Sequence, residues 1–107
     1  MAQKKSFKLV YDTGITQHIA VIESKYHSLI RRTIEEQLSH EPNVETRNRK
    51  PLRRPSVFGT AWELRFGSDN RFRIFYRTHL ETHEVNILAV GFKKGGRLFI
   101  AGEEFKL

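Results

Sequence analysis

Two runs of alternating residues, at positions 62–67 and 71–78, constrain the fold of this chain more than any other feature. In both runs apolar side chains alternate with charged ones, so that Trp62, Leu64 and Phe66 are separated by Glu63 and Arg65. Successive side chains of a strand point to opposite faces, and this period of two therefore predicts strands with one apolar face and one arginine-bearing face. Residues 67–70 (Gly-Ser-Asp-Asn) have turn composition, so we expect the two strands to form a hairpin.

A third strand is predicted at residues 85–92, which are apolar on both faces: Val85, Ile87 and Ala89 on one, Leu88, Val90 and Phe92 on the other. A strand of that kind lies inside a sheet. Residues 7–11 alternate as well and predict a first strand. Residues 97–101 predict a short strand after the turn at Gly95 and Gly96, and residues 102–107 are expected to form a frayed acidic end.

Apolar residues at a spacing of three and four predict amphipathic helix from about residue 15 to residue 39. Asp12 or Thr13 is the candidate N-cap. Ser24 could cap a second helix, so the pattern leaves open one bent helix or two helices, and Pro42 predicts an end near His40. The fold class expected is α+β: one domain over residues 1–107, with an N-terminal strand and a helical hairpin packed on a curled, mainly antiparallel sheet of four to five strands.

The net charge of +7 is concentrated in one region, because residues 46–97 hold twelve lysines and arginines against four acids. Concentrated positive charge is typical of proteins that bind polyanions. A basic face kept for solubility is the alternative. Within the irregular stretch 43–59, five basic residues occupy eight positions without an acid: Arg47, Arg49, Lys50, Arg53 and Arg54. Two prolines argue against helix or central strand there, and we expect a loop that contacts phosphates.

Several classes of site are excluded or disfavoured by what the sequence lacks. The chain has no cysteine, so it forms neither disulfides nor zinc-thiolate sites. It has no histidine and carboxylate cluster with metal-ligand spacing and no phosphate-binding glycine loop, so we expect no metal or other cofactor. Neither a signal peptide nor an apolar run of about 20 residues is present, which favours a cytoplasmic protein without a membrane partner.

In this order of elements the chain resembles the RelE/ParE superfamily of bacterial type II toxins, especially the ribosome-dependent mRNA interferases. The resemblance rests on five segments: 36–42 (EQLSHEP), 45–52 (ETRNRKPL), 62–65 (WELR), 73–76 (RIFY) and 87–91 (ILAVG). It implies a toxin that represses translation by cleaving mRNA on the ribosome. In such a reaction the 2′-hydroxyl of the RNA attacks the adjacent phosphate without a metal ion. It also implies a cognate antitoxin, expected to be a small acidic protein. A DNA gyrase inhibitor or a non-catalytic RNA-binding module of the same fold is the alternative.

The resemblance also assigns candidate catalytic residues. Arg65 matches the phosphate-binding arginine of the family, Lys93 matches a second basic catalytic position, and Lys50, with Arg49 or Arg53, matches a basic pair beside the attacking hydroxyl. Parity places Arg73 opposite Arg65 on the same face, where both could bind one phosphate. Phe99 stands where the family often has a catalytic tyrosine, and a phenylalanine can stack on a base but cannot transfer a proton.

The remaining candidates come from the face that each side chain is expected to occupy. Phe75 shares the arginine face and is the candidate for stacking on an RNA base. Glu63 could orient Arg65, act as a base or form a structural salt bridge, and the histidines are expected at the solvated surface. The full set expected to contact RNA is Arg47, Arg49, Arg53, Arg54, Arg71, Phe75, Lys94 and Arg97.

Overall fold

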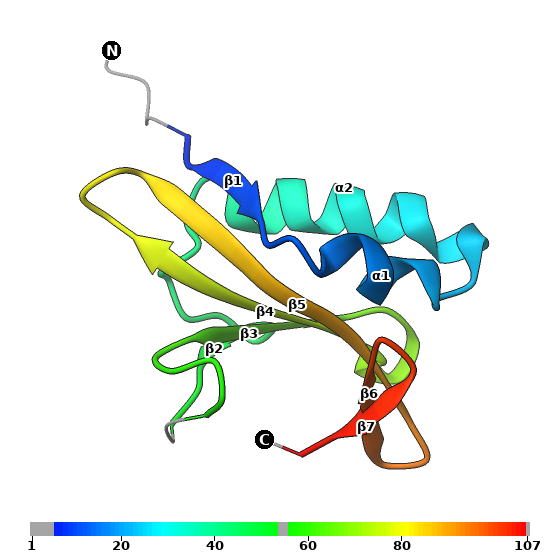
Figure 1. Cartoon of the computed structure of the whole chain (residues 1–107). Helices are drawn as coiled ribbons and strands as arrows, with labels where there is room; N and C mark the ends of the chain where they lie inside the picture. Colours follow the sequence, from blue (N-terminus) through cyan, green and yellow to red (C-terminus); the bar gives the residue numbers. More distant parts are fainter. Residues whose placement is uncertain (1–5, 54–55, 107) are drawn as a thin grey trace.

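In the computed structural model, which describes residues 6–53 and 56–106, two helices cover one face of a seven-stranded sheet (Figure 1). The helices are α1 (Ile15–Ala20) and α2 (His27–Leu38), with 3-10 turns η1 (Ser24–Tyr26) and η2 (Ser68–Asn70). The strands are β1 (Lys8–Tyr11), β2 (Arg49–Pro51), β3 (Trp62–Phe66), β4 (Phe72–His79), β5 (Glu84–Lys94), β6 (Arg97–Ile100) and β7 (Glu103–Phe105). None of the helices in these ranges is long and apolar enough to cross a membrane.

The predicted meander forms the centre of the sheet. The strand order is β2-β3-β4-β5-β6-β7 with antiparallel neighbours, while β1 pairs in parallel with β5. The α+β class and the mainly antiparallel sheet are confirmed, but the sheet has more strands than the expected four to five. The additional strands, β2 and β7, are three residues long and lie in segments predicted to be a loop and a frayed end. Pro51 is compatible with β2 because this strand lies at the edge of the sheet.

The helical segment contains two helices, which answers the question that the spacing pattern left open. Helix α1 ends at Ala20, and the chain then becomes extended at Glu23, whose φ is −52° and ψ is 135°. His27, the first residue of α2, fixes this corner by donating from Nε2 to the Ile22 carbonyl over 2.7 Å. The N-cap prediction was wrong, since Gly14 is the N-cap of α1 and no side chain caps it.

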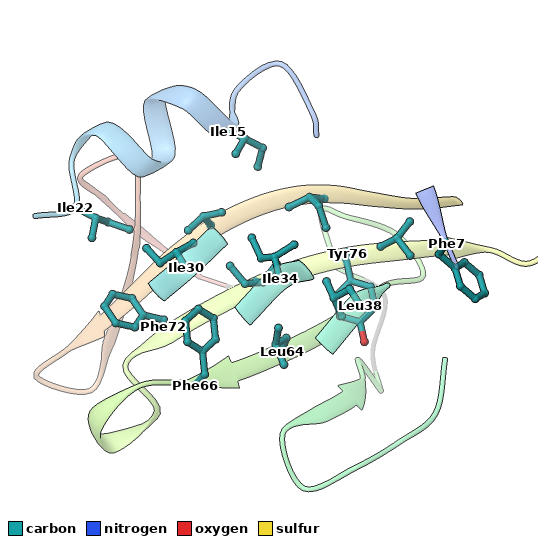
Figure 2. Close-up of a cluster of buried hydrophobic side chains, with 14 residues drawn as sticks. Phe7, Ile15, Ile22, Ile30, Ile34, Leu38, Leu64, Phe66, Phe72 and Tyr76 are labelled. Carbon is teal, nitrogen blue, oxygen red and sulfur yellow. The ribbon is translucent and has the colours of Figure 1, made fainter. Parts of the chain in front are cut away.

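The main core lies between α2 and the sheet, as Figure 2 shows. Helix α2 buries Ile30, Ile34 and Leu38 at a spacing of four residues. They pack into one cluster with the apolar face of the meander, whose buried members are Leu64, Phe66, Phe72, Ile74 and Tyr76. The predicted apolar face is therefore confirmed.

A β-bulge in the β4–β5 pair changes the faces predicted for the central strand. Tyr76 opposes Ile87, whereas the preceding Phe75 opposes Ala89, so β5 has one extra residue at Leu88. Such an insertion shifts every later side chain of the strand to the other face. Val85 and Ile87 therefore share the core with Val90, and Ala89 lies on the opposite side, which corrects the grouping expected from strict alternation.

A second, smaller cluster covers part of the face that points away from the helices. It contains Phe75, Ala89, Leu98 and Ile100, with Leu52, Phe58 and Phe105 packed against them. The Phe58 ring stacks with Phe75 at 5.0 Å and with Phe105 at 5.5 Å between centroids. The segment after β2 and the last strand therefore meet beneath β4.

Helix α1 closes a gap in the sheet beside β5. Strand β1 pairs with β5 only at residues 84–87, and β6 pairs with it only at residues 91–94. Between these two pairings the Val90 N–H donates to His18 Nδ1 over 3.2 Å. Burial lowers the pKa of His18 below its usual value, against the smaller opposing effect of Asp12. The hydrogen bond itself requires the neutral imidazole, because a protonated Nδ1 cannot accept.

Candidate nucleic-acid interface

A buried carboxylate joins two arginines on the sheet face opposite the helices. The register of β3 and β4 places Arg65 directly opposite Arg73, as parity predicted. Glu63 accepts from Arg65 Nε at Oε1 over 2.8 Å and from Arg73 Nη1 at Oε2 over 3.2 Å. The side chains of Glu63 and Arg73 are only 6% and 9% exposed, whereas that of Arg65 is 43% exposed. Glu63, Arg65 and Arg73 therefore form a three-residue ion-pair network in which Arg65 reaches the surface.

Arg73 is held from two sides. Besides its contact with Glu63, its Nε donates to the Asn70 carbonyl over 2.9 Å. Asn70 belongs to η2, the turn between β3 and β4, where it has a positive φ of 50°. A guanidinium with two such partners is fixed in one orientation, so Arg73 is less available to a ligand than the sequence suggested.

Two lysines extend the basic face on either side of this network. Lys50 in β2 pairs with Glu63 in the register and is exposed. Lys93 in β5 stands two residues after Gly91, which opposes Arg73, and it is exposed as well. Both lysines therefore share the face of Arg65 by strand alternation. The structure thus brings Lys50 and Lys93 to the face of Arg65 and Arg73, for which alternation had predicted a shared face only for the two arginines.

A hollow of about 780 Å³ lies at the end of the sheet, beside η1, η2 and the turn after β5. Four of the predicted residues line it, namely Arg71, Arg73, Lys93 and Lys94, together with Tyr26 and the acids Glu23 and Asp69. Arg71 donates from Nη1 to the Tyr26 hydroxyl over 3.3 Å, and its Cζ lies 5.9 Å from the centre of the Tyr26 ring. The Arg71 guanidinium therefore reaches the helix side of the sheet, where Tyr26 packs against the main core, and the helical spacing of Tyr26 gave no signal of this contact.

Phe99 does not join the arginines. It pairs with Phe92, its ring lies 5.9 Å from that ring, and Phe92 packs against the main core on the helix side. Phe99 therefore lies on the opposite face from Arg65, and the expected grouping of these two residues at one site is wrong. Lys94 and Arg97 are paired with each other, and each lies two residues from a member of the Phe92–Phe99 pair. Their side chains therefore point to the same face as Phe99, away from Arg65.

Arg49 and Phe75 are structural residues, contrary to the expected contacts with RNA. Arg49 is 8% exposed, opposes Leu64, and donates from Nη1 to the Gln37 carbonyl over 2.6 Å. Gln37 lies in the last turn of α2, where a cation is favourable. Phe75 is completely buried beneath Phe58. Neither side chain is accessible to an RNA ligand.

Three predicted residues of the irregular stretch 43–59 remain, namely Arg47, Arg53 and Arg54. Arg47 and Arg53 are exposed and compatible with contacts to a phosphate backbone. Arg54 lies outside the described residues. Within the described ranges, no three histidine, aspartate or glutamate side chains are close enough to hold a metal ion.

No protein-family model matches the chain, and no curated protein does. Among solved structures it is similar to a chain of the toxin-antitoxin complex RelBE2 from Mycobacterium tuberculosis. The superposition has a TM-score of 0.67 at 24% sequence identity, and it covers 82% of this chain and 99% of that chain. The chain has a RelE-like fold. This fold agrees with the resemblance seen in the sequence. The Glu63 network and its flanking lysines lie on the sheet face that the helices leave uncovered.

Proposed function

We propose that this chain is the toxin of a type II toxin-antitoxin system, a single RelE-like domain that cleaves mRNA on the ribosome and so represses translation in the cytoplasm. The observation that carries the proposal is the basic sheet face, where a buried carboxylate holds the surface-exposed Arg65 between Lys50 and Lys93. Concentrated, oriented positive charge of this kind suits a phosphate backbone. The toxin-antitoxin complex with the same fold supports the assignment to the toxin class.

In the proposed reaction the 2′-hydroxyl of the RNA attacks the adjacent phosphorus, and the bond to the 5′-oxygen of the next nucleotide breaks. The products are a 2′,3′-cyclic phosphate and a 5′-hydroxyl, so one proton leaves the nucleophile and one reaches the leaving group. Arg65 contacts the phosphate oxygens and stabilises the additional negative charge of the transition state, an effect that is often the largest in catalysis. Lys50 and Lys93 bind the flanking backbone. No metal ion takes part in this proposal.

The proposed protein partner is a cognate antitoxin, a small acidic protein. The excess of positive charge lies in residues 46–97, the region that contains the basic face. An acidic segment that orders on this face would exclude RNA both by occupying the surface and by neutralising its charge.

A second candidate function is RNA binding without cleavage, and the position of Phe99 favours it. Phe99 has no hydroxyl and lies on the opposite face from Arg65, so the residue matched to the family's tyrosine supplies no proton transfer there. Proton-transfer groups typically contribute about 100- to 10,000-fold to a rate.

The deciding experiment adds the purified chain to ribosomes programmed with a defined mRNA and maps the 5′ ends of the products. New 5′-hydroxyl ends at codon-related positions support the nuclease. RNA binding without new ends supports the second candidate. Inhibition of DNA gyrase by a chain that neither cleaves nor binds RNA would contradict both functions.

A further inference from the structure

Glu63 is an unexpected residue on a face proposed to bind RNA. Its carboxylate is buried and carries a negative charge close to where phosphates would lie. Such a charge opposes phosphate binding. Stability alone does not explain the arrangement, because buried ion pairs contribute little compared with packed apolar residues.

The contacts of Arg65 indicate what Glu63 does. Glu63 takes only the Nε of Arg65, which leaves the two terminal nitrogens with four N–H groups for a ligand. Arginine side chains have many rotamers, and holding one of them reduces the entropy lost when phosphate binds. The bond to Nε therefore fixes the direction of the guanidinium without occupying the nitrogens that would contact phosphate.

Arg73 holds Glu63 from the other side. Its Nη1 contacts the second carboxylate oxygen, and its Nε is bonded to the Asn70 carbonyl. A continuous set of contacts thus runs from the backbone of η2 through Arg73 and Glu63 to the exposed Arg65. In this arrangement Arg73 lies behind Glu63, whereas the sequence suggested that Arg65 and Arg73 bind one phosphate together.

We propose that Glu63 is a positioning residue which, backed by Arg73, orients the Arg65 guanidinium toward a phosphate of single-stranded RNA. The proposal rests on the proposed function, and it predicts that affinity and turnover respond differently to the loss of Glu63. Removing the charge makes the face more positive, so RNA binding stays the same or becomes tighter. Losing the carboxylate also loosens Arg65, because a glutamine has one acceptor oxygen where Glu63 has two and cannot hold both arginines, so cleavage becomes slower.

The test compares Glu63→Gln and Glu63→Asp with wild type and with Glu81→Gln, which removes the same charge from the exposed turn between β4 and β5. RNA affinity is measured with a substrate that carries a 2′-deoxy nucleotide at the cleavage position, and kcat is measured on programmed ribosomes. We expect Glu63→Gln to lose about 10- to 100-fold in kcat without weaker RNA binding, since a misplaced group can cost about 100-fold. Glu63→Asp should recover part of the loss because it keeps the carboxylate, and Glu81→Gln should cleave like wild type.

A double-mutant cycle shows whether Glu63 acts through Arg65. In an Arg65→Ala background, Glu63→Gln should lower kcat no further. Unchanged kcat in a folded Glu63→Gln variant would overturn the proposal, and so would an equal loss in both backgrounds. If Glu63→Gln does not fold, Glu63→Asp takes its place in the cycle.

A measurement that does not depend on activity separates this proposal from the proposed function. The Arg65 Nε–H signal in NMR spectra should exchange with water more slowly in wild type than in Glu63→Gln. Equal exchange rates would overturn the positioning role. If wild type does not cleave RNA but the exchange rates differ, the proposed nuclease fails while the positioning of Arg65 by Glu63 stands.

Discussion

Arg65 and Arg73 illustrate at the scale of the residue how two arginines on one face acquire different roles. Both contact Glu63, yet the side chain of Arg65 is 43% exposed and that of Arg73 only 9%. The exposed guanidinium is free to bind a ligand, whereas the buried one compensates the charge of Glu63. Their substitutions should therefore affect activity and stability in different proportions.

Arg65→Ala should lower cleavage about 100- to 1,000-fold, the typical cost of losing one donor to a developing anion. It should lower the unfolding free energy less than Arg73→Ala does, because Arg65 is 43% exposed and water can take its place beside Glu63. Arg73→Ala removes one partner of a buried ion pair and should lower the unfolding free energy by about 3 kcal/mol. Urea unfolding and cleavage on programmed ribosomes test both variants. Equal stability of the two variants would contradict the assigned roles.

His18 makes stability depend on pH in a direction that follows from its hydrogen bond. Burial lowers the pKa of folded His18 below the ordinary 6.5, so the unfolded chain binds more protons between the two values. The contribution of His18 to the unfolding free energy should therefore be fully present above pH 6.5. It should be lost as the pH falls through the pKa of folded His18. Urea midpoints at pH 5 and pH 7.5 measure this difference, and it should be smaller in His18→Gln. An equal difference in both proteins would show that other groups cause it.

At the scale of the element, α2 and the meander depend on each other through their apolar faces. Ile74 in β4 is completely buried in the cluster that the sheet forms with α2. Ile74→Ala should lower the unfolding free energy by about 2–5 kcal/mol because it removes contacts and leaves a cavity. The exposed Val57→Ala is the control and should change it by less than about 0.5 kcal/mol. An unchanged thermal midpoint for Ile74→Ala would mean that this face is not the core.

The pairing of β5 and β6 determines what Phe99 can do. Since its ring packs beside Phe92 on the face opposite Arg65, a hydroxyl added there cannot reach a phosphate bound by Arg65. Phe99→Tyr should therefore leave kcat within about twofold of wild type, where a correctly placed proton donor would contribute about 100-fold or more. A large gain in cleavage from a stable Phe99→Tyr variant would contradict the pairing of Phe99 with Phe92.

At the scale of the whole molecule, the excess charge of residues 46–97 should make RNA binding strongly dependent on salt. Each phosphate contact with a single strand contributes about 0.7 to the slope of log affinity against log salt. Lys50→Gln combined with Lys93→Gln should reduce this slope by about 1.4, while Lys8→Gln on β1 should leave it unchanged. Filter-binding titrations at several salt concentrations measure the slopes. A salt-independent affinity would contradict the basic face as the RNA-binding surface.

The local pattern of the sequence was sufficient for the elements at the centre of the fold. The alternation in β3 and β4 and the two apolar faces of β5 predicted the meander, and the spacing of three and four predicted the helical region. These predictions hold because side-chain periodicity and burial are coupled within a few residues. The alternation also placed Arg65 opposite Arg73, because the register of the β3–β4 hairpin alone determines this pairing.

Only the tertiary structure decided the features that depend on contacts between distant segments. The extra residue at Leu88 changes faces midway along β5, and no local pattern marks such a bulge. Arg49 is buried because the carbonyl of Gln37 at the end of α2 lies above it, and Phe75 is covered by Phe58 from a separate loop. The role of Glu63 depends in the same way on two arginines from different places in the chain. Arg65 lies on the same strand, β3, and Arg73 lies on the neighbouring strand, β4. Alternation fixes the face of a side chain, whereas its partners and exposure depend on which segments fold over that face.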